Sequence, residues 1–274
     1  MTFDDLYLHE ADMLPIRREL YHSHGQGFYV FRSFLSGEQT AHMRTFWSTL
    51  QPDDWHSEYK GMDRMYRGCP NYYAHEDNGG QLSYFNFLWN EPPDELTYSV
   101  AFAIQQLRNR VESRTIYREI FPMSGRSASY RIVLSRNIRE IVVPHRDWTG
   151  QHFDPRRLQV TLFLAEKGSD YQGLGFGMET NDGRRVVFGD DVEIRPGDLV
   201  LWRYNNLHFA QEVSSSNGIG FMRMLMPPEA IPEQSAETRA KMLRENLKAR
   251  VKALPLVGSH ALPVYRKLRG STRG

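Results

Sequence analysis

The sequence predicts an α+β protein with a mainly β core, preceded and followed by helices. Many short runs of β-branched and aromatic residues, separated by Gly, Asp and Asn, lie between residues 124 and 228. Such runs favour an antiparallel sandwich or barrel over alternating βαβ units. Apolar residues at helical spacing precede and follow this region. We expect one domain, with a helical and loop-rich part at 1–123, the β core at 124–228 and a basic C-terminal helix and tail at 229–274.

The N-terminal elements follow from local signals. Apolar residues predict a helix over 14–22, which Gly25 should end. Aromatic and β-branched residues predict a strand over 27–31. Ser36 and Gln39 have the spacing of a capping box, so a second helix should begin there.

Residues 51–92 are crowded with Tyr, Trp, Gly, Pro and Asn and are expected to be irregular. A loop-rich stretch of this length is often a lid or pocket wall, but a surface excursion that packs its own aromatics fits equally well. A third helix should begin near Pro93, because apolar residues then recur at helical spacing.

Seven short strands are expected in the β core, at 129–134, 140–143, 158–164, 185–188, 192–194, 199–202 and 219–226. The chain returns to helix after Pro232, where Met242, Leu243, Leu247 and Val251 form an apolar stripe.

Composition excludes several classes of protein. Of the 274 residues, 40% are hydrophobic and 24% are charged, as in an ordinary globular protein. No stretch approaches the ~20 apolar residues that span a bilayer, and the acidic N-terminus differs from a signal peptide. One cysteine, Cys69, fits a reducing cytoplasm and excludes an internal disulfide. The basic residues of 239–274 could face an anionic substrate or surface, but a solvated tail is the simpler expectation. They are not interleaved with aromatics, so we expect no nucleic acid.

Three neighbourhoods could carry chemistry. His145 ends an apolar run, and on an extended chain His145 and Asp147 point to the same face, with Cα atoms about 6.5 Å apart. Both could therefore bind one ion. His152 and Asp154 repeat this spacing, but in a loop context. The second neighbourhood is His208, which follows an apolar strand that begins after a Pro-Gly-Asp turn.

The third neighbourhood is Arg223, which interrupts the apolar strand 219–226. A buried arginine requires an anion, because an unpaired buried charge is costly. A dicarboxylate bound to a metal at one end would supply that anion. Two imidazoles and one carboxylate form the facial triad that suits non-haem Fe(II).

The chain resembles an Fe(II)- and 2-oxoglutarate-dependent dioxygenase of the phytanoyl-CoA dioxygenase-like group. The matching features are His145-Arg146-Asp147-Trp148, the strand 158–164, the strand that leads from Pro196-Gly197-Asp198 to His208, and Arg223 beyond it. A strand at 27–36 followed by a capped helix is similar to the usual opening of that group. Together the features cover most of residues 20–228.

Membership would imply a double-stranded β-helix, a jelly-roll or cupin-like barrel. It would also imply catalytic Fe(2+) held by His145, Asp147 and His208, with 2-oxoglutarate and O2 as cosubstrates. Arg223 would bind the distal carboxylate of 2-oxoglutarate; Arg203, Arg131 and Arg136 are alternative anchors. By strand position, Gln159, Thr161 and Tyr130 are either cosubstrate contacts or ordinary sheet residues.

The resemblance implies oxidation of an unactivated C–H of a small-molecule metabolite or natural-product intermediate, with release of succinate and CO2. Trp148, Arg131 and Trp202 are candidate substrate contacts, although Trp148 fits a packing role as well. Arginines near the mouth would suit an anionic substrate, but solvent exposure explains them equally. A cupin-type metal enzyme that does not use 2-oxoglutarate and a non-catalytic barrel scaffold are the alternatives.

Overall fold

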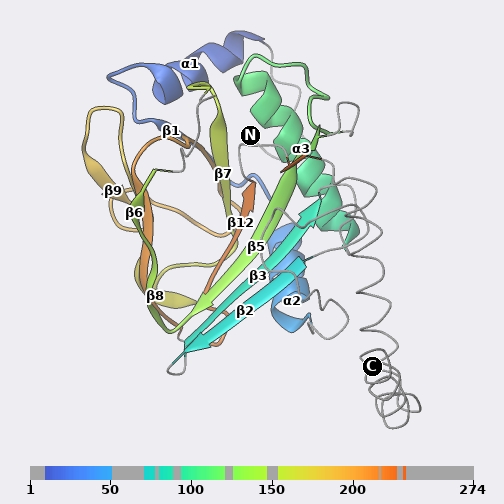
Figure 1. The fold of residues 1–274 in the computed structure, drawn as a ribbon, viewed down its shortest axis with the longest axis vertical. Coiled ribbons are helices and arrows are strands. Elements are labelled where there is room, and N and C mark those ends of the chain that lie inside the picture. The colour runs from blue at the N-terminus through green and yellow to red at the C-terminus, as the bar shows by residue number, and fades with distance from the viewer. Residues whose placement is uncertain are drawn as a thin grey trace, which may run out of the picture. The chain divides into compact units, whose positions relative to one another are not determined.

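A computed structural model describes residues 10–50, 71–77, 80–88, 94–120, 126–146, 154–215, 217–226 and 231–232. The chain divides into two compact units, residues 1–233 and 234–274, and all the described residues belong to the first. Within it, the described residues form α-helices and antiparallel sheets (Figure 1). Residues 51–70 of the predicted irregular segment 51–92 lie outside the described residues, as does the predicted C-terminal helix.

The helices of the described part are α1 (Glu10–Tyr21), α2 (Gly37–Thr49) and α3 (Glu95–Val111). The first strands are β1 (Phe28–Phe31), β2 (Asn71–Asp77), β3 (Gly80–Leu88), β4 (Arg126–Ser127), β5 (Ser129–Arg136), β6 (Ile138–His145) and β7 (Leu158–Phe163). The later strands are β8 (Tyr171–Glu179), β9 (Arg185–Val187), β10 (Leu199–Arg203), β11 (His208–Ser215), β12 (Phe221–Met226) and β13 (Ile231–Pro232).

Two sheets form the core. One has seven strands in the order β1-β10-β7-β12-β5-β3-β2, and the other has four in the order β6-β11-β8-β9. All their strand pairs are antiparallel. The chain passes from one sheet to the other between β5 and β6, and again between β6 and β7. The prediction of a mainly β, antiparallel core, with helices in the N-terminal part of the chain, is confirmed.

Capping residues fix where the helices begin. Ser36 and Gln39 form the predicted capping box at the start of α2. Asp94 caps α3 and accepts a hydrogen bond from the Thr97 backbone N–H (2.8 Å). The same carboxylate is hydrogen-bonded to His42 Nε2 (2.8 Å), a contact that links α2 to α3. These bonds satisfy backbone groups that the helix itself leaves without partners.

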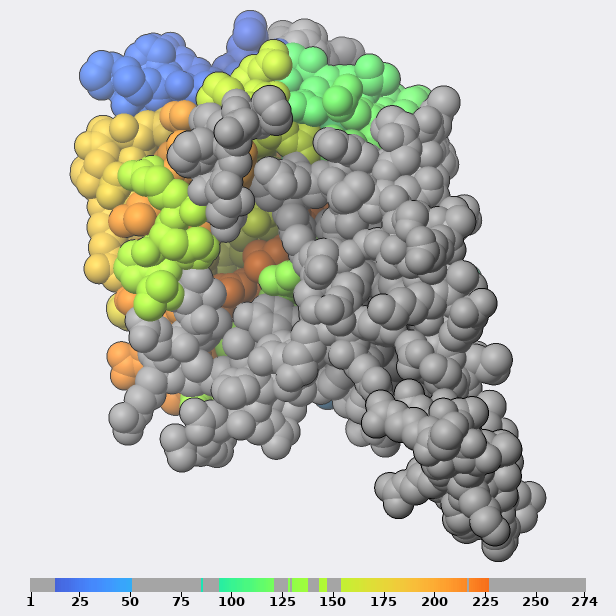
Figure 2. Space-filling view, in the orientation of Figure 1, coloured from blue at the N-terminus to red at the C-terminus, as the bar shows by residue number. Residues whose placement is uncertain are grey.

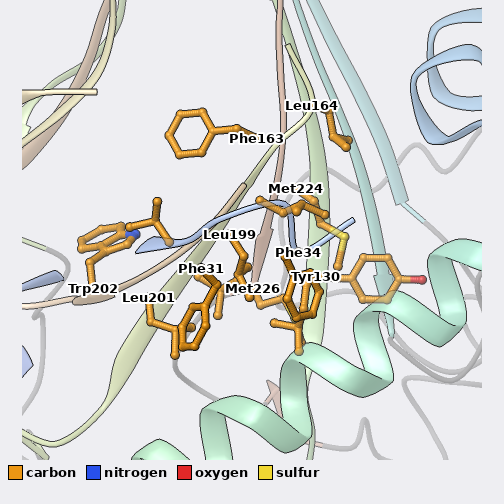
Figure 3. Close-up of a cluster of buried hydrophobic side chains, with 14 of the residues drawn as sticks. Phe31, Phe34, Tyr130, Phe163, Leu164, Leu199, Leu201, Trp202, Met224 and Met226 are labelled. Atoms are coloured by element: carbon orange, nitrogen blue, oxygen red, sulfur yellow. The ribbon is translucent and has the colours of Figure 1, made fainter. Parts of the chain in front are cut away.

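The two faces of the seven-stranded sheet pack against different partners. Successive residues of a strand point to opposite faces, so Leu201 and Trp202 diverge on β10. Figure 3 shows Leu201 and Met226 on the side of α3, while Trp202 and Phe163 point away from the helix. Trp202 meets Phe176 of β8 at 5.3 Å between ring centroids, so its face is the one turned toward the four-stranded sheet. We call it the inner face.

The expectation that 51–92 is irregular is wrong for two segments, because β2 and β3 are paired strands of the large sheet. Their sequences are rich in Tyr and Phe, which favour strands. Asn78-Gly79 stands between them, and this dipeptide is the strongest short-range hairpin signal. The Asn-Gly dipeptide therefore predicts this hairpin, although the high content of Gly, Pro and Asn in 51–92 favours an irregular segment.

The segment 192–194 is not a strand, since Val192 makes only an isolated bridge to Phe188. It follows a turn in which the Val187 carbonyl accepts hydrogen bonds from the backbone N–H groups of Asp191 and Val192. The strand β8 was not predicted, because its sequence contains three glycines that weaken strand propensity. In the space-filling view β8 and β9 (yellow) lie along one flank of the molecule (Figure 2).

The glycines of β8 are required by its neighbours. A Cβ on Gly173 would stand 1.8 Å from the Glu212 carbonyl oxygen, and one on Gly177 would stand 2.2 Å from the Phe209 ring. β11 therefore approaches β8 too closely for any side chain at these positions. Among the described residues, no helix is long and apolar enough to cross a membrane.

Candidate active site

The site begins with two histidines at the adjoining ends of β6 and β11. His145 is the last residue of β6 and His208 the first of β11, and the two are paired across the ladder. Their ring centroids lie 4.2 Å apart, with an interplanar angle of 53°. The structure thus brings together two of the three predicted metal ligands.

The same local hydrogen bond fixes the tautomer of both rings. His145 Nδ1 lies 2.9 Å from the Val143 carbonyl oxygen, and His208 Nδ1 lies 3.1 Å from that of Asn206. A carbonyl oxygen can only accept a hydrogen bond, so each Nδ1 carries the proton. Nε2 is then the basic nitrogen of each imidazole, the form in which histidine binds a metal.

Aromatic rings hold His208 in place. Its side chain is buried, and its ring lies 4.6 Å from Trp202 and 6.4 Å from Phe176. The Trp202 indole is itself fixed, because its Nε1–H donates to Thr161 Oγ1 (3.1 Å). His145, by contrast, is only partly buried. His208 is therefore packed among aromatic rings, and His145 lies nearer the surface.

Arg223 lies on the inner face of the seven-stranded sheet, the face that also carries Trp202. It is 4% exposed and is paired across the sheet with Phe163. Its guanidinium carbon lies 4.5 Å from the Phe221 ring centroid and 5.9 Å from that of Phe176, within range of cation–π attraction. The cation also acts on a neighbour: burial raises the pKa of Tyr171, and the charge of Arg223 partly opposes that rise.

Gln159 and Thr161 are on the inner face, on the strand next to both Trp202 and Arg223. Gln159 is paired with Trp202, and Thr161 with Leu225. Both side chains are buried, and Gln159 Oε1 accepts a hydrogen bond from the Val160 backbone N–H (3.2 Å). They therefore line the inner face on the strand between the one that carries Trp202 and the one that carries Arg223.

Other predicted residues are placed differently. Tyr130 lies on the opposite face, beside α3 in Figure 3, and does not face Arg223. Burial raises the pKa of its phenol well above the usual value, and the charge of Asp94 adds to that rise. Arg131 is paired with Leu225, so it belongs to the inner face and is partly buried.

Two of the three alternative anchors, Arg203 and Arg136, lie away from Arg223. Arg203 shares the face of Leu201 and donates from Nη1 to Asn181 Oδ1 (3.2 Å). Arg136, at the end of β5, donates from Nε to the Ile219 carbonyl oxygen (3.3 Å). Of the four arginines considered as anchors, Arg223 and Arg131 are the two on the inner face, on neighbouring strands.

Asp147, Trp148 and His152 are outside the described residues. Asp154, from the second His-x-Asp pattern, pairs with Arg114 (2.7 Å). Within the described ranges, no three His, Cys, Asp or Glu side chains are grouped as a metal site would need. Asp147, the third predicted ligand, therefore stays a prediction.

Solved structures show what the chain is similar to. AviO1 from Streptomyces viridochromogenes Tue57 matches with a TM-score of 0.51 and 15% identity, over 82% of this chain and 98% of AviO1. SnoN, a non-haem α-ketoglutarate-dependent epimerase from nogalamycin biosynthesis, matches with a TM-score of 0.51 and 11% identity, over 84% of this chain and 89% of SnoN. The chain shares their fold.

No protein-family model and no curated protein matches the sequence. The likeness is therefore one of backbone arrangement and not of sequence. SnoN has also been crystallised in complex with Fe3+, α-ketoglutarate and nogalamycin RO, again with a TM-score of 0.51 to this chain.

Sequence reasoning missed the residues that support the histidines. Arg146, to which the sequence analysis gave no role, donates from Nη1 to the Asn205 carbonyl oxygen (2.6 Å) and lies 3.5 Å from Glu179. It thus connects the end of β6 to the turn before β11. Asn206, which accepts from His208, was not singled out either. No local pattern marks such residues, because the side-chain partners of Arg146 and Asn206 come from distant parts of the chain.

Proposed function

We propose that this protein is a non-haem Fe(II)- and 2-oxoglutarate-dependent dioxygenase. It would oxidise an unactivated C–H of a small-molecule metabolite or natural-product intermediate and release succinate and CO2. One observation carries the proposal: His145 and His208 adjoin at paired strand ends, and both present Nε2 as the basic nitrogen.

Strand order supports a double-stranded β-helix for the core. The strands β5 to β12 divide into the neighbours β10-β7-β12-β5 in one sheet and β6-β11-β8-β9 in the other. In chain order the strands β5 to β8 alternate between the two sheets, and so do β9 to β12, as a chain wound around a jelly roll must. The shared fold with AviO1 and SnoN favours the same interpretation.

The residues present fit an iron site. Two neutral imidazoles with oriented Nε2 atoms supply nitrogen donors, and Asp147, two positions after His145, would supply a carboxylate. This donor set is the facial triad, which leaves coordination positions open for cosubstrates. When bound, Fe(II) would supply the oxygen chemistry that no side chain of the protein can perform.

Arg223 would bind the distal carboxylate of 2-oxoglutarate. Its cation is buried on the inner face that also carries Trp202, the tryptophan packed against His208. Arginine can grip a carboxylate with two parallel hydrogen bonds. Thr161 and Gln159, on the strand between, would line the cosubstrate. Tyr130 is not retained as a contact, since it points to α3.

A small-molecule substrate fits the neighbours' chemistry, as SnoN binds nogalamycin RO. Arg131 on the inner face and Trp148 after Asp147 are proposed substrate contacts, and Arg131 would suit an anionic group. Trp202 is proposed as a wall of the same space, because Thr161 and His208 fix its indole. We also propose a cytoplasmic protein in which the whole chain serves one dioxygenase domain.

The test is an anaerobic titration with Fe(II) and 2-oxoglutarate, followed by visible absorption. We expect a weak metal-to-ligand charge-transfer band that needs both components. Succinate release on admission of air would then permit a screen of substrates. Iron binding without the band would favour a cupin-type enzyme, and no iron binding would favour a scaffold; either result contradicts the proposal.

A further inference from the structure

An unusual pair of asparagines connects His208 to the N-terminal part of the chain. Asn206 Nδ2 donates to the Glu179 carbonyl oxygen (3.0 Å) and to Asn181 Oδ1 (3.2 Å). Asn181 Nδ2 in turn donates to the carbonyl oxygens of Leu20 (3.0 Å) and His22 (2.8 Å), at the end of α1. Asn206 is 8% exposed, so most of its amide is withdrawn from water.

Asn206 acts on His208 through its own backbone. Its carbonyl oxygen accepts from His208 Nδ1 (3.1 Å), and its N–H donates to the Arg203 carbonyl oxygen (2.9 Å), closing the turn between β10 and β11. The side-chain amide therefore fixes the residue whose carbonyl fixes the imidazole. Loss of the amide bonds would let the carbonyl rotate and release the Nδ1 proton from its acceptor.

Gly27 shows how tightly the pair is packed. An ideal Cβ at this position would stand 2.5 Å from Asn206 Nδ2 and 2.6 Å from Asn181 Oδ1. Its φ of +77° also belongs to the region that glycine tolerates best. Gly27 lies directly before β1, and its carbonyl oxygen accepts a hydrogen bond from the Arg203 backbone N–H (2.9 Å). The two asparagine side chains therefore fill the space in which a side chain at position 27 would lie.

We propose that Asn206 and Asn181 are positioning residues for His208, holding its ring in the Nδ1–H tautomer so that Nε2 can bind the metal. This inference rests on the proposed function only for the identity of the site as a metal centre. Outer partners of a metal-bound histidine typically affect metal affinity by 10–100-fold.

The main test is Asn206→Asp, which keeps the shape of the side chain and removes its N–H donors. The probe is Mn(II), whose free concentration is read from its electron paramagnetic resonance signal. We expect the dissociation constant for Mn(II) to rise about 10-fold or more. Gly27→Ala, which displaces the pair from outside the site, should weaken binding in the same direction.

Asn109→Asp is the matched control. Asn109 is fully buried on α3, and its Nδ2 also donates to two carbonyl oxygens, those of Ile116 (2.9 Å) and Arg118 (2.8 Å). Both variants should lose thermal stability, but only Asn206→Asp should lose Mn(II) affinity. If Asn109→Asp weakens Mn(II) binding equally, the effect is general destabilisation and the proposal fails.

A second readout needs no metal. Nitrogen-15 NMR of histidine-labelled, metal-free protein reports the tautomer of each ring, and His208→Gln identifies the His208 signals. The wild type should show Nδ1–H at His208, and Asn206→Asp should show a mixture of tautomers. An unchanged tautomer and unchanged Mn(II) affinity would overturn the inference. If the wild type binds no Mn(II), the proposed function fails, and the tautomer alone decides the role of Asn206.

Discussion

His145 and His208 lie with ring centroids 4.2 Å apart because the last residue of β6 is paired with the first residue of β11. The ladder between these strands is irregular, with register shifts on both sides of Ala210. Bulges of this kind re-aim side chains and are frequent next to active sites. The irregular ladder thus sets where the two imidazoles meet.

Alanine in place of His145, Asp147 or His208 should abolish metal binding while the fold is retained. A ligand lost directly should cost at least the 10–100-fold in affinity typical of an outer partner. Mn(II) titration and circular dichroism measure the two effects. His42→Ala is the control, because His42 pairs with Asp94 on the helices. Loss of the folded state in all three variants would indicate structural roles instead.

Arg223→Leu should weaken 2-oxoglutarate binding by roughly 10–100-fold, the value of hydrogen bonds to a charged group. The charge-transfer titration and the KM for 2-oxoglutarate both measure this. Arg184→Leu is the control, since Arg184 is exposed and its side chain contacts Asp182 and Gln26, neither of which is on the inner face. If Arg223→Leu leaves the requirement intact, Arg131 becomes the next anchor to test.

Thr161→Val should destabilise the protein by about 1–3 kcal/mol, because it leaves the buried Trp202 N–H without its acceptor. Chemical denaturation measures the free energy of unfolding. Adding Trp202→Phe removes the donor as well, so the double variant should lose less than the sum of the two single changes. Strict additivity would show that the hydrogen bond contributes nothing.

Arg157→Met should lower stability, but by less than the about 3–5 kcal/mol of an uncompensated buried charge, because Arg114 Nε still lies 3.1 Å from Glu112 Oε2. Arg157 Nη1 lies 3.0 Å from Glu112 Oε2, and the Glu112 side chain is fully buried. Glu112→Gln keeps an oxygen for the Leu158 backbone N–H, which now donates to Glu112 Oε1 (2.8 Å). Added to Arg157→Met, it should restore part of the loss in urea denaturation. A further loss would contradict the ion-pair account.

Asp94→Asn should lower stability near neutral pH by about 1 kcal/mol, as loss of a cap does, and the deficit should shrink in acid. Burial alone would raise the pKa of Asp94, but hydrogen bonds from His42 and Thr97 outweigh it and hold the pKa below its usual value. A carboxyl whose pKa is lowered by folding stabilises above the unfolded pKa of about 4, and this contribution is lost as pH falls.

Ser36→Ala provides the contrast for that series. Ser36 caps α2 through a neutral hydroxyl, so its loss should cost a similar free energy at every pH. Denaturation of both variants at several pH values compares them. Equal deficits for Asp94→Asn at neutral and acid pH would contradict the charge-dependent role.

Local patterns predicted much of the fold. The capping box at Ser36, the run 158–164 and the strand that carries Arg223 are confirmed, because each depends on residues close in sequence. The face of Tyr130 could not be predicted. Both faces of β5 are buried, with Ile132 and Val133 each at 0% exposure, so its sequence shows no alternation to distinguish them.

By itself the sequence determined the kinds of chemistry available: the spacing of His145 and Asp147, a second histidine after an apolar strand, and an arginine within another. Only the tertiary structure decided which of these groups meet. Pairing of β6 with β11 brings His145 next to His208. Pairing with β11 also holds the glycine-rich segment 171–179 as the strand β8. The asparagine support of His208 depends equally on distant strands. Such contacts are set by strand register and packing, which join residues that no local pattern relates.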